Sequence, residues 1–457
     1  MVYFRMLFNS YQFIFVFLLP LLVVYRYVGV HYRLWFLVAA SVLFYGQWSV
    51  VHLGVLLVSI GVNFALVGLM LRLSGRKFVL FCVILFNLGL LGYFKYSGLL
   101  FAGGGSVVLP LAISFFTFQQ IAYGVDVYKM RVVAHNLSNY LFFVLFFPQL
   151  VAGPIVHYNQ LIAQIGQLEL VRTKDHFWAQ GLILFSLGLF KKVAIADTLG
   201  GISDPFFDKG AIDGSLSTLE AWVGMFAYGL QIYFDFSGYS DMALGLAFFF
   251  GIVLPINFYS PYKAVSVVEF WRRWHITLSN FLRDHVYIPL GGSRASKYKE
   301  GFNLLVTMGL GGLWHGAGWS FVVWGLGHGV LLMVAHLWRR MGLVRVPPFV
   351  AIGVTFLAVN LLWVLFRAQD IGVALSYYGV MFDFGSFGSF EFDRLWWLVV
   401  GGLAIVWLLP NSIEFSNYGE REIRHLYAKL FFAALSFFVS LQMMASAPSQ
   451  EFVYFNF

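Results

Sequence analysis

The sequence has little charge and a single cysteine. Only 11% of its 457 residues are Asp, Glu, Lys or Arg, whereas a soluble domain carries about 25%. Hydrophobic residues make up 60% and the mean hydropathy is +0.80, a composition typical of a polytopic membrane protein. The lone cysteine, Cys82, excludes an internal disulfide and a cysteine metal cluster, and no metal-ligand spacing of the HExxH type occurs.

Long polar stretches are also absent, so no segment is suited to fold as a separate soluble domain. We therefore predict one membrane-embedded domain over residues 1–457. The net charge of +8 does not indicate a nucleic-acid partner, because Lys and Arg collect in the cytoplasmic loops of membrane proteins. The first apolar run lacks a small-residue cleavage site, so we expect no cleavable signal peptide.

Apolar runs near the length of a membrane crossing dominate the first part of the chain. Basic residues follow the first, third and fifth runs, and the positive-inside rule places those loops in the cytoplasm and the N-terminus outside. The runs cover residues 13–27, 34–45, 51–71, 78–93 and 107–122, and three later crossings are expected at 349–366, 395–409 and 430–444.

Residues 142–156 interrupt this pattern. Pro148 and Pro154 would each break a helix interior, and irregular backbone at membrane depth persists only where protein buries it or where it lines a cavity. The stretch is either a re-entrant or broken segment or a proline-kinked span. Further on, Lys191 and Lys192 follow an apolar run, and we expect them to mark a helix end at the membrane interface.

Acidic and hydroxyl side chains occur among aromatic residues at positions 235–241. Asp235 and Asp241 are six residues apart and fall on different helix faces, which does not favour a paired acid–base dyad. Gly238 lies between them and indicates a break between two spans. The polar side chains would then cap the helix ends, as Asp and Ser often do.

The most charged segment, residues 269–294, has a helical period. Arg272 and Arg283 share one flank of the expected helix, while Arg273 points away from an apolar stripe about 100° wide. The stripe consists of Trp271, Trp274, Leu278, Phe281, Leu282 and His285. This pattern predicts a basic amphipathic helix at the membrane surface. The helix is either an interfacial anchor or a site where the arginines bind a polyanion such as a phosphate-bearing coenzyme.

A glycine-rich stretch, residues 309–329, carries His315 with no acid or base nearby in sequence. An ionisable residue at membrane depth costs a few kcal/mol, which makes His315 a candidate functional residue. The alternative is a packed, hydrogen-bonded histidine. A second histidine, His328, lies about 220° further around an ideal helix, so the two side chains converge only if the helix breaks.

These segments together resemble the membrane-bound O-acyltransferases. The resemblance rests on FWRRWHITLSNFLRDHVYIPLGGSR and TMGLGGLWHGAGW, preceded in family order by ISFFTFQQIAYGVDVYK, FFPQLVAGPI, KKVAIADTL and YFDFSGYSDMALG. It covers essentially the whole chain and is densest over residues 113–329. It is closest to the branch that acetylates alginate, peptidoglycan or cellulose, while the related D-alanyl transferases share FWRRWH and the WHG core.

The resemblance implies an all-α polytopic fold with about 11–13 transmembrane helices, plus re-entrant and amphipathic helices around a central funnel. It implies that His315 is the catalytic histidine and that His275 is a second functional position. The candidates for contacting the coenzyme are Arg272, Arg273, Arg283 and Trp274. Relatives usually carry Tyr or Phe at the position of His285, which we interpret as a packing residue.

The expected function is O-acetylation of an extracytoplasmic polysaccharide of the alginate, cellulose or peptidoglycan type. Acetyl-CoA is the expected donor, as a substrate and not as a bound cofactor, and no metal is expected. His315 would act as general base, because an imidazole with a pKa of about 6.5 suits proton transfer at neutral pH. His275 would orient or polarise the acceptor or the thioester.

The resemblance also implies a bacterial inner membrane location, with the N-terminus in the periplasm. The expected partners are a periplasmic SGNH-type acetyltransferase that completes the transfer, membrane lipid and the polysaccharide machinery. Three alternatives remain. D-alanyl-type transfer to a cell-envelope polymer is one. A transporter is another, since broken helices and buried polar groups are typical there as well. The third is a scaffold, for which His315 would be dispensable.

Overall fold

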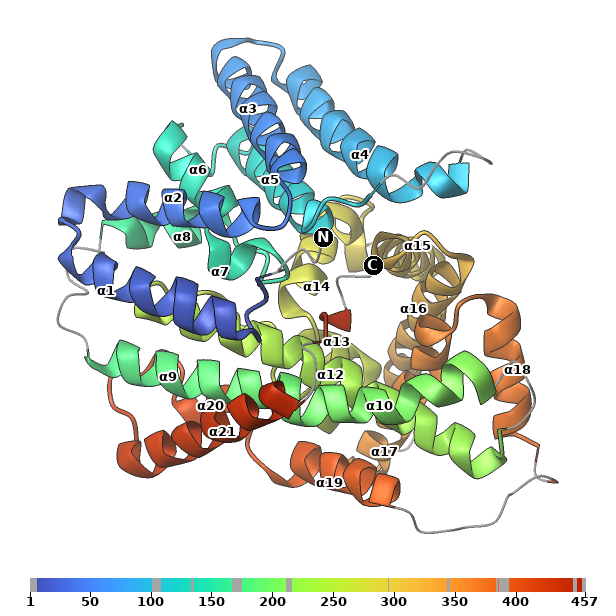
Figure 1. Ribbon diagram of the computed structural model, residues 1–457. Coiled ribbons are helices and arrows are strands. Elements are labelled where there is room, and N and C mark those ends of the chain that lie inside the picture. Colours follow the sequence, from blue (N-terminus) through green and yellow to red (C-terminus); the bar gives the residue numbers. More distant parts are fainter. Residues whose placement is uncertain are drawn as a thin grey trace. The chain divides into compact units, whose positions relative to one another are not determined.

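The computed structural model describes residues 6–100, 108–132, 135–166, 175–210, 216–294, 296–342, 346–383, 385, 394–446 and 450–453. Within these ranges the protein is helical and has no strand, which confirms the all-α class (Figure 1). The chain forms two compact units, and each combines segments that are far apart in sequence. The first unit contains residues 1–189, 239–256 and 416–456, and the second contains residues 190–238, 257–415 and 457. Our prediction of one domain over the whole chain stays a prediction.

The first unit consists mainly of the N-terminal helices and the last one. The helices α3 and α4 form an antiparallel pair that packs on α5 (Figure 1). The elements are η1 (Gln12–Leu18), α1 (Leu19–Tyr27), η2 (Val30–Tyr32), α2 (Arg33–Gly46), α3 (Val50–Arg72), α4 (Arg76–Leu100), α5 (Ile113–Tyr128), α6 (Leu137–Leu145), α7 (Phe147–Leu150), α8 (Tyr158–Ile165), α9 (Asp175–Phe190) and α21 (Leu426–Ser446).

The second unit contains the histidine-bearing segments. Its elements are η4 (Lys191–Ala196), α10 (Asp197–Pro205), η5 (Phe206–Gly210), η6 (Pro261–Lys263), α13 (Val267–Arg273), α14 (Ile276–Leu282), η7 (Arg283–Tyr287), η8 (Gly292–Arg294), α15 (Lys297–His315), α16 (Trp319–Met341), α17 (Pro348–Arg367), α18 (Ile371–Met381), α19 (Arg394–Leu408) and α20 (Ser412–Ser416). The long helix α12 (Thr218–Phe249) is divided between the two units after Gly238.

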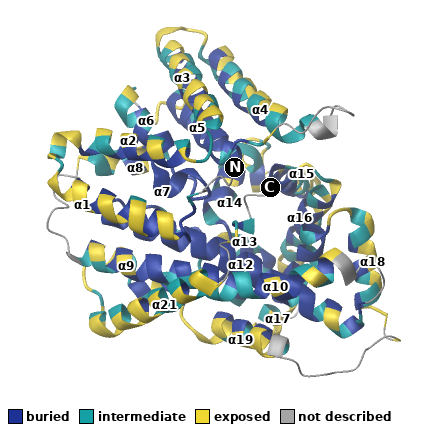
Figure 2. Cartoon of the chain, in the orientation of Figure 1, coloured by how far each residue is buried: buried dark blue, intermediate teal, exposed yellow. Residues whose placement is uncertain are grey.

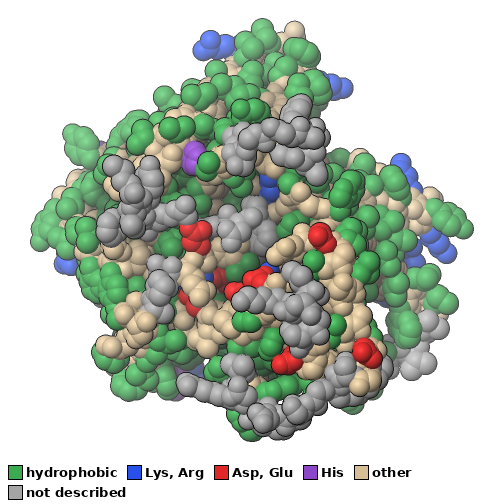
Figure 3. Space-filling model, turned by 45° about the vertical axis from the view of Figure 1, so that its right-hand side comes forward, with side chains coloured by type: hydrophobic (Ala, Val, Ile, Leu, Met, Phe, Trp, Pro, Cys, Tyr) green, Lys and Arg blue, Asp and Glu red, His purple; other side chains and the backbone are tan. Residues whose placement is uncertain are grey.

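Several helices are long and apolar enough to cross a membrane. Hydrophobic side chains cover much of the described surface on the face drawn in Figure 3, as expected for helices that contact lipid. Within the described residues, five helices meet the criterion of length and hydropathy: Val50–Arg72, Arg76–Ser97, Trp319–Met341, Pro348–Arg367 and Leu426–Ser446. Shorter apolar helices cover Gln12–Tyr27, Val30–Gly46, Ile371–Met381 and Trp396–Leu408. The protein is thus polytopic, and the total of 11–13 crossings stays a prediction.

The stretch from residue 142 to 156 is broken, as the sequence predicted. Helix α6 ends at Leu145, because the ψ of 106° at Phe146 lies outside the helical region, and the short α7 begins directly after Phe146. Pro148 occupies the first turn of α7, where its missing N–H costs no helical hydrogen bond. Residues 151–157 are then irregular up to the start of α8. A continuous proline-kinked span is therefore wrong for this stretch.

The expected helix end at the two lysines is wrong. The helix continues from α9 through a π-helical segment into α10, and Lys192 is 1% exposed. Its Nζ lies 2.7 Å from a carboxylate oxygen of both Asp197 and Asp235, so the charge is paired inside the protein and does not extend to the interface. Lys191 donates a hydrogen bond to Ser412 at 2.9 Å.

The expected break at Gly238 is also wrong. Helix α12 runs without interruption from Thr218 to Phe249, and it is buried along most of its length (Figure 2). Asp235 and Asp241 lie inside this helix and do not cap its ends. The carboxylate of Asp235 is stabilised by Lys192, a partner that local sequence does not reveal.

Glycines allow α15 and α16 to cross at very short distance. A Cβ on Gly312 would lie 2.2 Å from the carbonyl oxygen of Phe321, and a Cβ on Gly325 would lie 2.2 Å from that of Met308. Helix α15 ends at His315, because Gly316 and Gly318 adopt extended backbone before α16 begins. The glycine-rich stretch therefore forms a helical hairpin with a histidine at its turn (Figure 1).

We predict that Gly312→Ala destabilises the protein, because the new methyl group must push the two helices apart. Overpacking of this kind costs about 1–3 kcal/mol. The control is Gly353→Ala in α17, where a Cβ would meet no atom within 4 Å. Thermal unfolding in detergent should show a lower Tm for Gly312→Ala only. Equal Tm values for the two variants would contradict the role of the close crossing.

Candidate active site

His275 lies at a break between two short helices. Helix α13 ends at Arg273, Trp274 is extended, and His275 has φ 43° and ψ 52°, in the left-handed region that non-glycine residues rarely adopt. The single amphipathic helix predicted for this segment is therefore wrong. The surrounding structure maintains the break, because Ile276 donates its N–H to the carbonyl of Asn257 at 3.0 Å.

The predicted apolar stripe is only partly correct. Four of its side chains are buried: Trp274, Leu278, Phe281 and Leu282. Trp271 and His285 are half-buried, because the break rotates the two helices relative to a single helical wheel. Trp274, expected to contact the coenzyme, is 1% exposed and packs between aromatic rings, including those of Phe270 at 5.4 Å and Trp363 at 5.0 Å.

The side chain of Asn257 determines the tautomer of His275. Its Oδ1 accepts hydrogen bonds from the backbone N–H and the hydroxyl of Thr277, at 3.2 and 3.0 Å, so this atom is an acceptor. His275 Nδ1 lies 3.2 Å from the same oxygen and must therefore be the donor. In the neutral ring, the lone pair is then on Nε2. Complete burial lowers the pKa of His275 to about 3, so the ring is neutral at pH 7.

His315, the last residue of α15, is 3% exposed and surrounded by aromatic rings. Its ring centroid lies 4.9 Å from Trp314, 5.1 Å from Trp324 and 5.1 Å from Phe366. Trp314 is also 6.1 Å from the ring of His275. The structure thus brings the two predicted histidines to one indole, within the second unit, although 40 residues separate them in sequence.

His328 lies near His315 because the helix breaks between the two residues. We call His275, His315 and His328, with Trp314 and Trp324 between them, the histidine cluster. Its ring is fully buried and lies 4.8 Å from Trp324, the indole that also contacts His315. Trp271 Nε1 donates a hydrogen bond to His328 Nδ1 at 3.3 Å. The sequence alone indicates no role for His328. A helix break between His315 and His328 is the condition under which the sequence allows the two side chains to converge. The hydrogen bond between Trp271 and His328 joins residues 57 positions apart, and no local pattern in the sequence indicates it.

Two of the three candidate arginines line one groove of the second unit. Arg272 and Arg273 face it from α13, and Arg339 faces it from the end of α16. Arg273 is also paired with Glu269 at 2.5 Å. The groove has a volume of about 880 Å³, and its walls include Leu331, Val334, Trp338, Ala351, Val354 and Ala358. It therefore combines a cationic rim with apolar walls.

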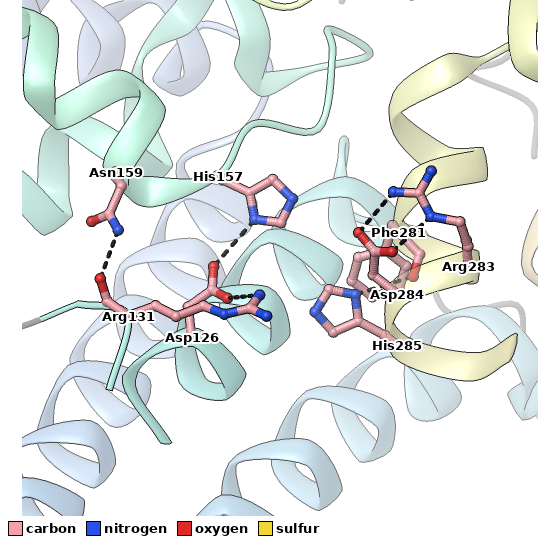
Figure 4. A network of polar contacts seen from close by, with 8 residues as sticks. All are labelled: Asp126, Arg131, His157, Asn159, Phe281, Arg283, Asp284 and His285. Carbon is pink, nitrogen blue, oxygen red and sulfur yellow. Dashed lines mark hydrogen bonds and ion pairs between the residues drawn. The ribbon is translucent and has the colours of Figure 1, made fainter. Parts of the chain in front are cut away.

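Arg283 is outside this groove. It lies in η7 and pairs with the carboxylate of Asp284, its Nε 2.8 Å from Oδ1 (Figure 4). His285 Nδ1 lies 3.0 Å from the carbonyl oxygen of Phe281, one turn earlier, and both residues are drawn in Figure 4. The two rings stack at 4.4 Å. These contacts are consistent with the packing role expected for His285.

Figure 4 shows a separate polar cluster in the first unit. Asp126 is buried, and its carboxylate lies 3.4 Å from Arg131 and 3.2 Å from His157. Asn159 donates to the carbonyl of Arg131 at 2.7 Å. These contacts connect the end of α5 to the loop before α8.

Comparison with known proteins agrees with the motifs. The model of the membrane-bound O-acyltransferase family matches residues 111–380, a range that contains all three histidines of the cluster. The chain belongs to this family. It is therefore an O-acyltransferase and a multi-pass membrane protein, in agreement with its apolar helices.

Individual relatives show which members of the family the chain resembles more. The chain is 41% identical to the peptidoglycan O-acetyltransferase of Helicobacter pylori, over 81% of this chain and 79% of that protein. It is 40% identical to the probable alginate O-acetylase AlgI of Pseudomonas aeruginosa, over 88% of this chain and 80% of that protein. Identity to the teichoic acid D-alanyltransferase of Streptococcus thermophilus is 28%, over 52% of this chain and 59% of that protein.

Proposed function

We propose that this enzyme transfers acetyl groups from cytoplasmic acetyl-CoA across the inner membrane for O-acetylation of an extracytoplasmic polysaccharide of the alginate, cellulose or peptidoglycan type. The observation that carries the proposal is the meeting of two buried histidines at Trp314. The relatives named as acetyl-transferring enzymes support an acetyl group over D-alanine, since both the identity and the coverage are higher for them.

In this mechanism His315 takes the proton of the acceptor hydroxyl. The oxygen forms a bond to the thioester carbonyl carbon, and the carbonyl oxygen becomes an oxyanion. When the C–S bond breaks, the acetyl group remains on the acceptor and the CoA thiolate takes the proton from the His315 imidazolium. One imidazole thus serves as base and then as acid.

His275 contributes by orienting the acceptor. Its Nδ1–H is directed to Asn257, so in the neutral ring Nε2 accepts hydrogen bonds and does not donate them. Such a nitrogen can accept a hydrogen bond from a donor group of the acceptor substrate other than the hydroxyl whose proton His315 takes, and it cannot polarise a thioester carbonyl. The hydrogen bonding therefore favours a role for His275 in orienting the acceptor substrate over a role in polarising the thioester.

The groove along α13 is proposed as the site of the coenzyme phosphates. Arg272, Arg273 and Arg339 supply cationic donors that match phosphate oxygens, and the apolar walls suit the rest of the donor. Helix α13 also carries Trp271, which contacts His328. The same helix thus connects the groove to the histidine cluster. Arg283 and Trp274 remain candidates, with weaker support because neither lines the groove.

A periplasmic partner completes the proposed pathway. The described residues form helical bundles, and none of them forms a separate soluble domain with a second active site. An SGNH-type acetyltransferase in the periplasm would accept the acetyl group and pass it to the polymer. The N-terminus of the chain would then face the periplasm, as the distribution of basic residues predicts.

The central test is His315→Ala. We expect it to reduce acetyl-CoA turnover by the purified enzyme at least 100-fold, and polymer acetylation in cells to background, because no other base replaces the imidazole. Protein amount and Tm should be unchanged. Full polymer acetylation by His315→Ala at normal protein level would falsify the assignment and would favour a transporter or a scaffold.

The groove is tested with the double variant Arg272→Ala/Arg339→Ala. We expect the KM for acetyl-CoA to rise at least 10-fold, with a smaller change in kcat, because two phosphate-binding charges are lost. The matched control, Lys297→Ala/Lys299→Ala, removes two exposed charges outside the groove. An unchanged KM together with loss of copurified anionic phospholipid would assign the groove to lipid instead. Arg283→Ala in the same assay shows whether the third arginine contributes.

The partner is tested by separating the two reactions. We expect acetyl-CoA turnover by the purified chain to need no other protein, whereas polymer acetylation in cells should require a periplasmic SGNH-type enzyme as well. Deleting that enzyme should leave the amount of the membrane protein unchanged. Normal acetylation in cells that lack every such enzyme would show that the chain reaches the polymer itself.

A further inference from the structure

Three buried polar groups lie along one face of α16. They belong to Ser320, Trp324 and His328, which follow one another at intervals of four residues and therefore occupy the same helix face. Each of these residues is at most 2% exposed. Among the residues that the structure describes, Ser320 Oγ, Trp324 Nε1 and His328 Nε2 have no hydrogen-bond partner. Buried polar atoms in this state are rare and unfavourable unless a ligand pairs with them.

At least two of these groups are hydrogen-bond donors. An indole Nε1–H can only donate. For His328 the tautomer follows from Trp271, whose Nε1–H donates to His328 Nδ1 at 3.3 Å. Since Nδ1 is the acceptor, the proton of the neutral ring is on Nε2. The face of α16 thus presents the N–H groups of Trp324 and His328, one turn apart, without an acceptor in the described part of the chain.

This face belongs to the site of the reaction. The ring of Trp324 lies 5.1 Å from that of His315, perpendicular to it, and 4.8 Å from that of His328. The donors therefore line the wall against which the proposed base packs. A ligand that reaches His315 and carries an oxygen acceptor would supply the missing partner for both N–H groups.

We propose that Trp324 and His328 bind the carbonyl oxygen of the acyl thioester. This inference rests on the proposed function. It assigns residues to the stabilisation of the carbonyl oxygen, a task that His315 and His275 do not perform. When the acceptor oxygen bonds to the carbonyl carbon, negative charge develops on the carbonyl oxygen, and the two N–H groups stabilise it until the C–S bond breaks. Trp271 is a positioning residue, because it keeps the His328 proton on Nε2.

A neighbouring tryptophan provides the matched control. Trp363 stacks on Trp324 at 5.5 Å and is fully buried. Its Nε1–H already donates to the hydroxyl of Tyr262 at 3.1 Å, so it is a structural donor with a partner. Trp363→Phe and Trp324→Phe therefore make the same change of side chain in the same aromatic cluster. Only the second removes an N–H group that we assign to the substrate.

Steady-state kinetics with acetyl-CoA test the assignment. We expect Trp324→Phe to lower kcat by about 100- to 1,000-fold, the range known for loss of one such donor, with less than about a threefold change in KM. Trp363→Phe should keep kcat within about twofold. His328→Leu should lose activity, while His328→Gln, which retains an N–H donor, should recover part of it. Trp271→Phe should have an intermediate kcat.

Infrared spectroscopy gives a readout that packing alone would not change. Acetyl-CoA labelled with ¹³C at the carbonyl is bound to His315→Ala, in which turnover is blocked. Its carbonyl band should lie below that of the free thioester, and adding Trp324→Phe should move it back. If Trp324→Phe does not accumulate, the comparison of His328→Leu with His328→Gln decides in both assays.

Two results would overturn the inference. One is a kcat for Trp324→Phe and His328→Leu equal to that of Trp363→Phe, and the other is a carbonyl band that does not respond to Trp324→Phe. Either result together with an inactive His315→Ala would leave the proposed function intact and remove only the carbonyl-binding role. An active His315→Ala would instead remove the proposed function.

Discussion

The close crossing of α15 and α16 is the constraint on which the histidine cluster depends. Gly312 and Gly325 bring the two backbones to a distance that no Cβ would allow, and the extended residues after His315 reverse the chain. His315 is thereby placed against Trp324, one turn from His328. Without the break between α15 and α16, His315 and His328 would point to different sides of a single helix. The glycines thus determine where the imidazoles meet.

In two of the histidines, a single hydrogen bond to Nδ1 determines whether Nε2 is a hydrogen-bond donor or an acceptor, and the outcome is opposite in the two rings. Asn257 accepts from Nδ1 of His275 and leaves Nε2 as an acceptor, whereas Trp271 donates to Nδ1 of His328 and leaves Nε2 as a donor. Both rings are fully buried, so water does not compete for these contacts. In addition to the base, a thioester transfer uses hydrogen-bond acceptors that orient the acceptor substrate and hydrogen-bond donors near the carbonyl oxygen. The cluster offers both, each fixed by a residue that itself need not touch the substrate.

Sequence reasoning succeeded where the physical cause is local. The apolar runs became α2, α3, α17 and α21, and prolines broke the stretch at 142–156, because composition and backbone sterics act on neighbouring residues. It failed at Lys192 and Gly238, where a buried charge and a glycine within a helix were read as boundaries. A helix continues there because Lys192 finds Asp197 and Asp235, and a partner 43 residues away leaves no periodicity to detect.

The same limit explains which part of the site could be foreseen. His315 stood out because an ionisable residue in a glycine-rich apolar stretch conflicts with its context, and such conflicts are expected at functional sites. His275 lies in the segment that periodicity predicts as one helix, although its left-handed backbone breaks that helix. Its contacts with Asn257 and the pairing of Trp271 with His328 are set by tertiary packing alone. The residues that control protonation are therefore the least visible in the sequence, although the chemistry depends on them.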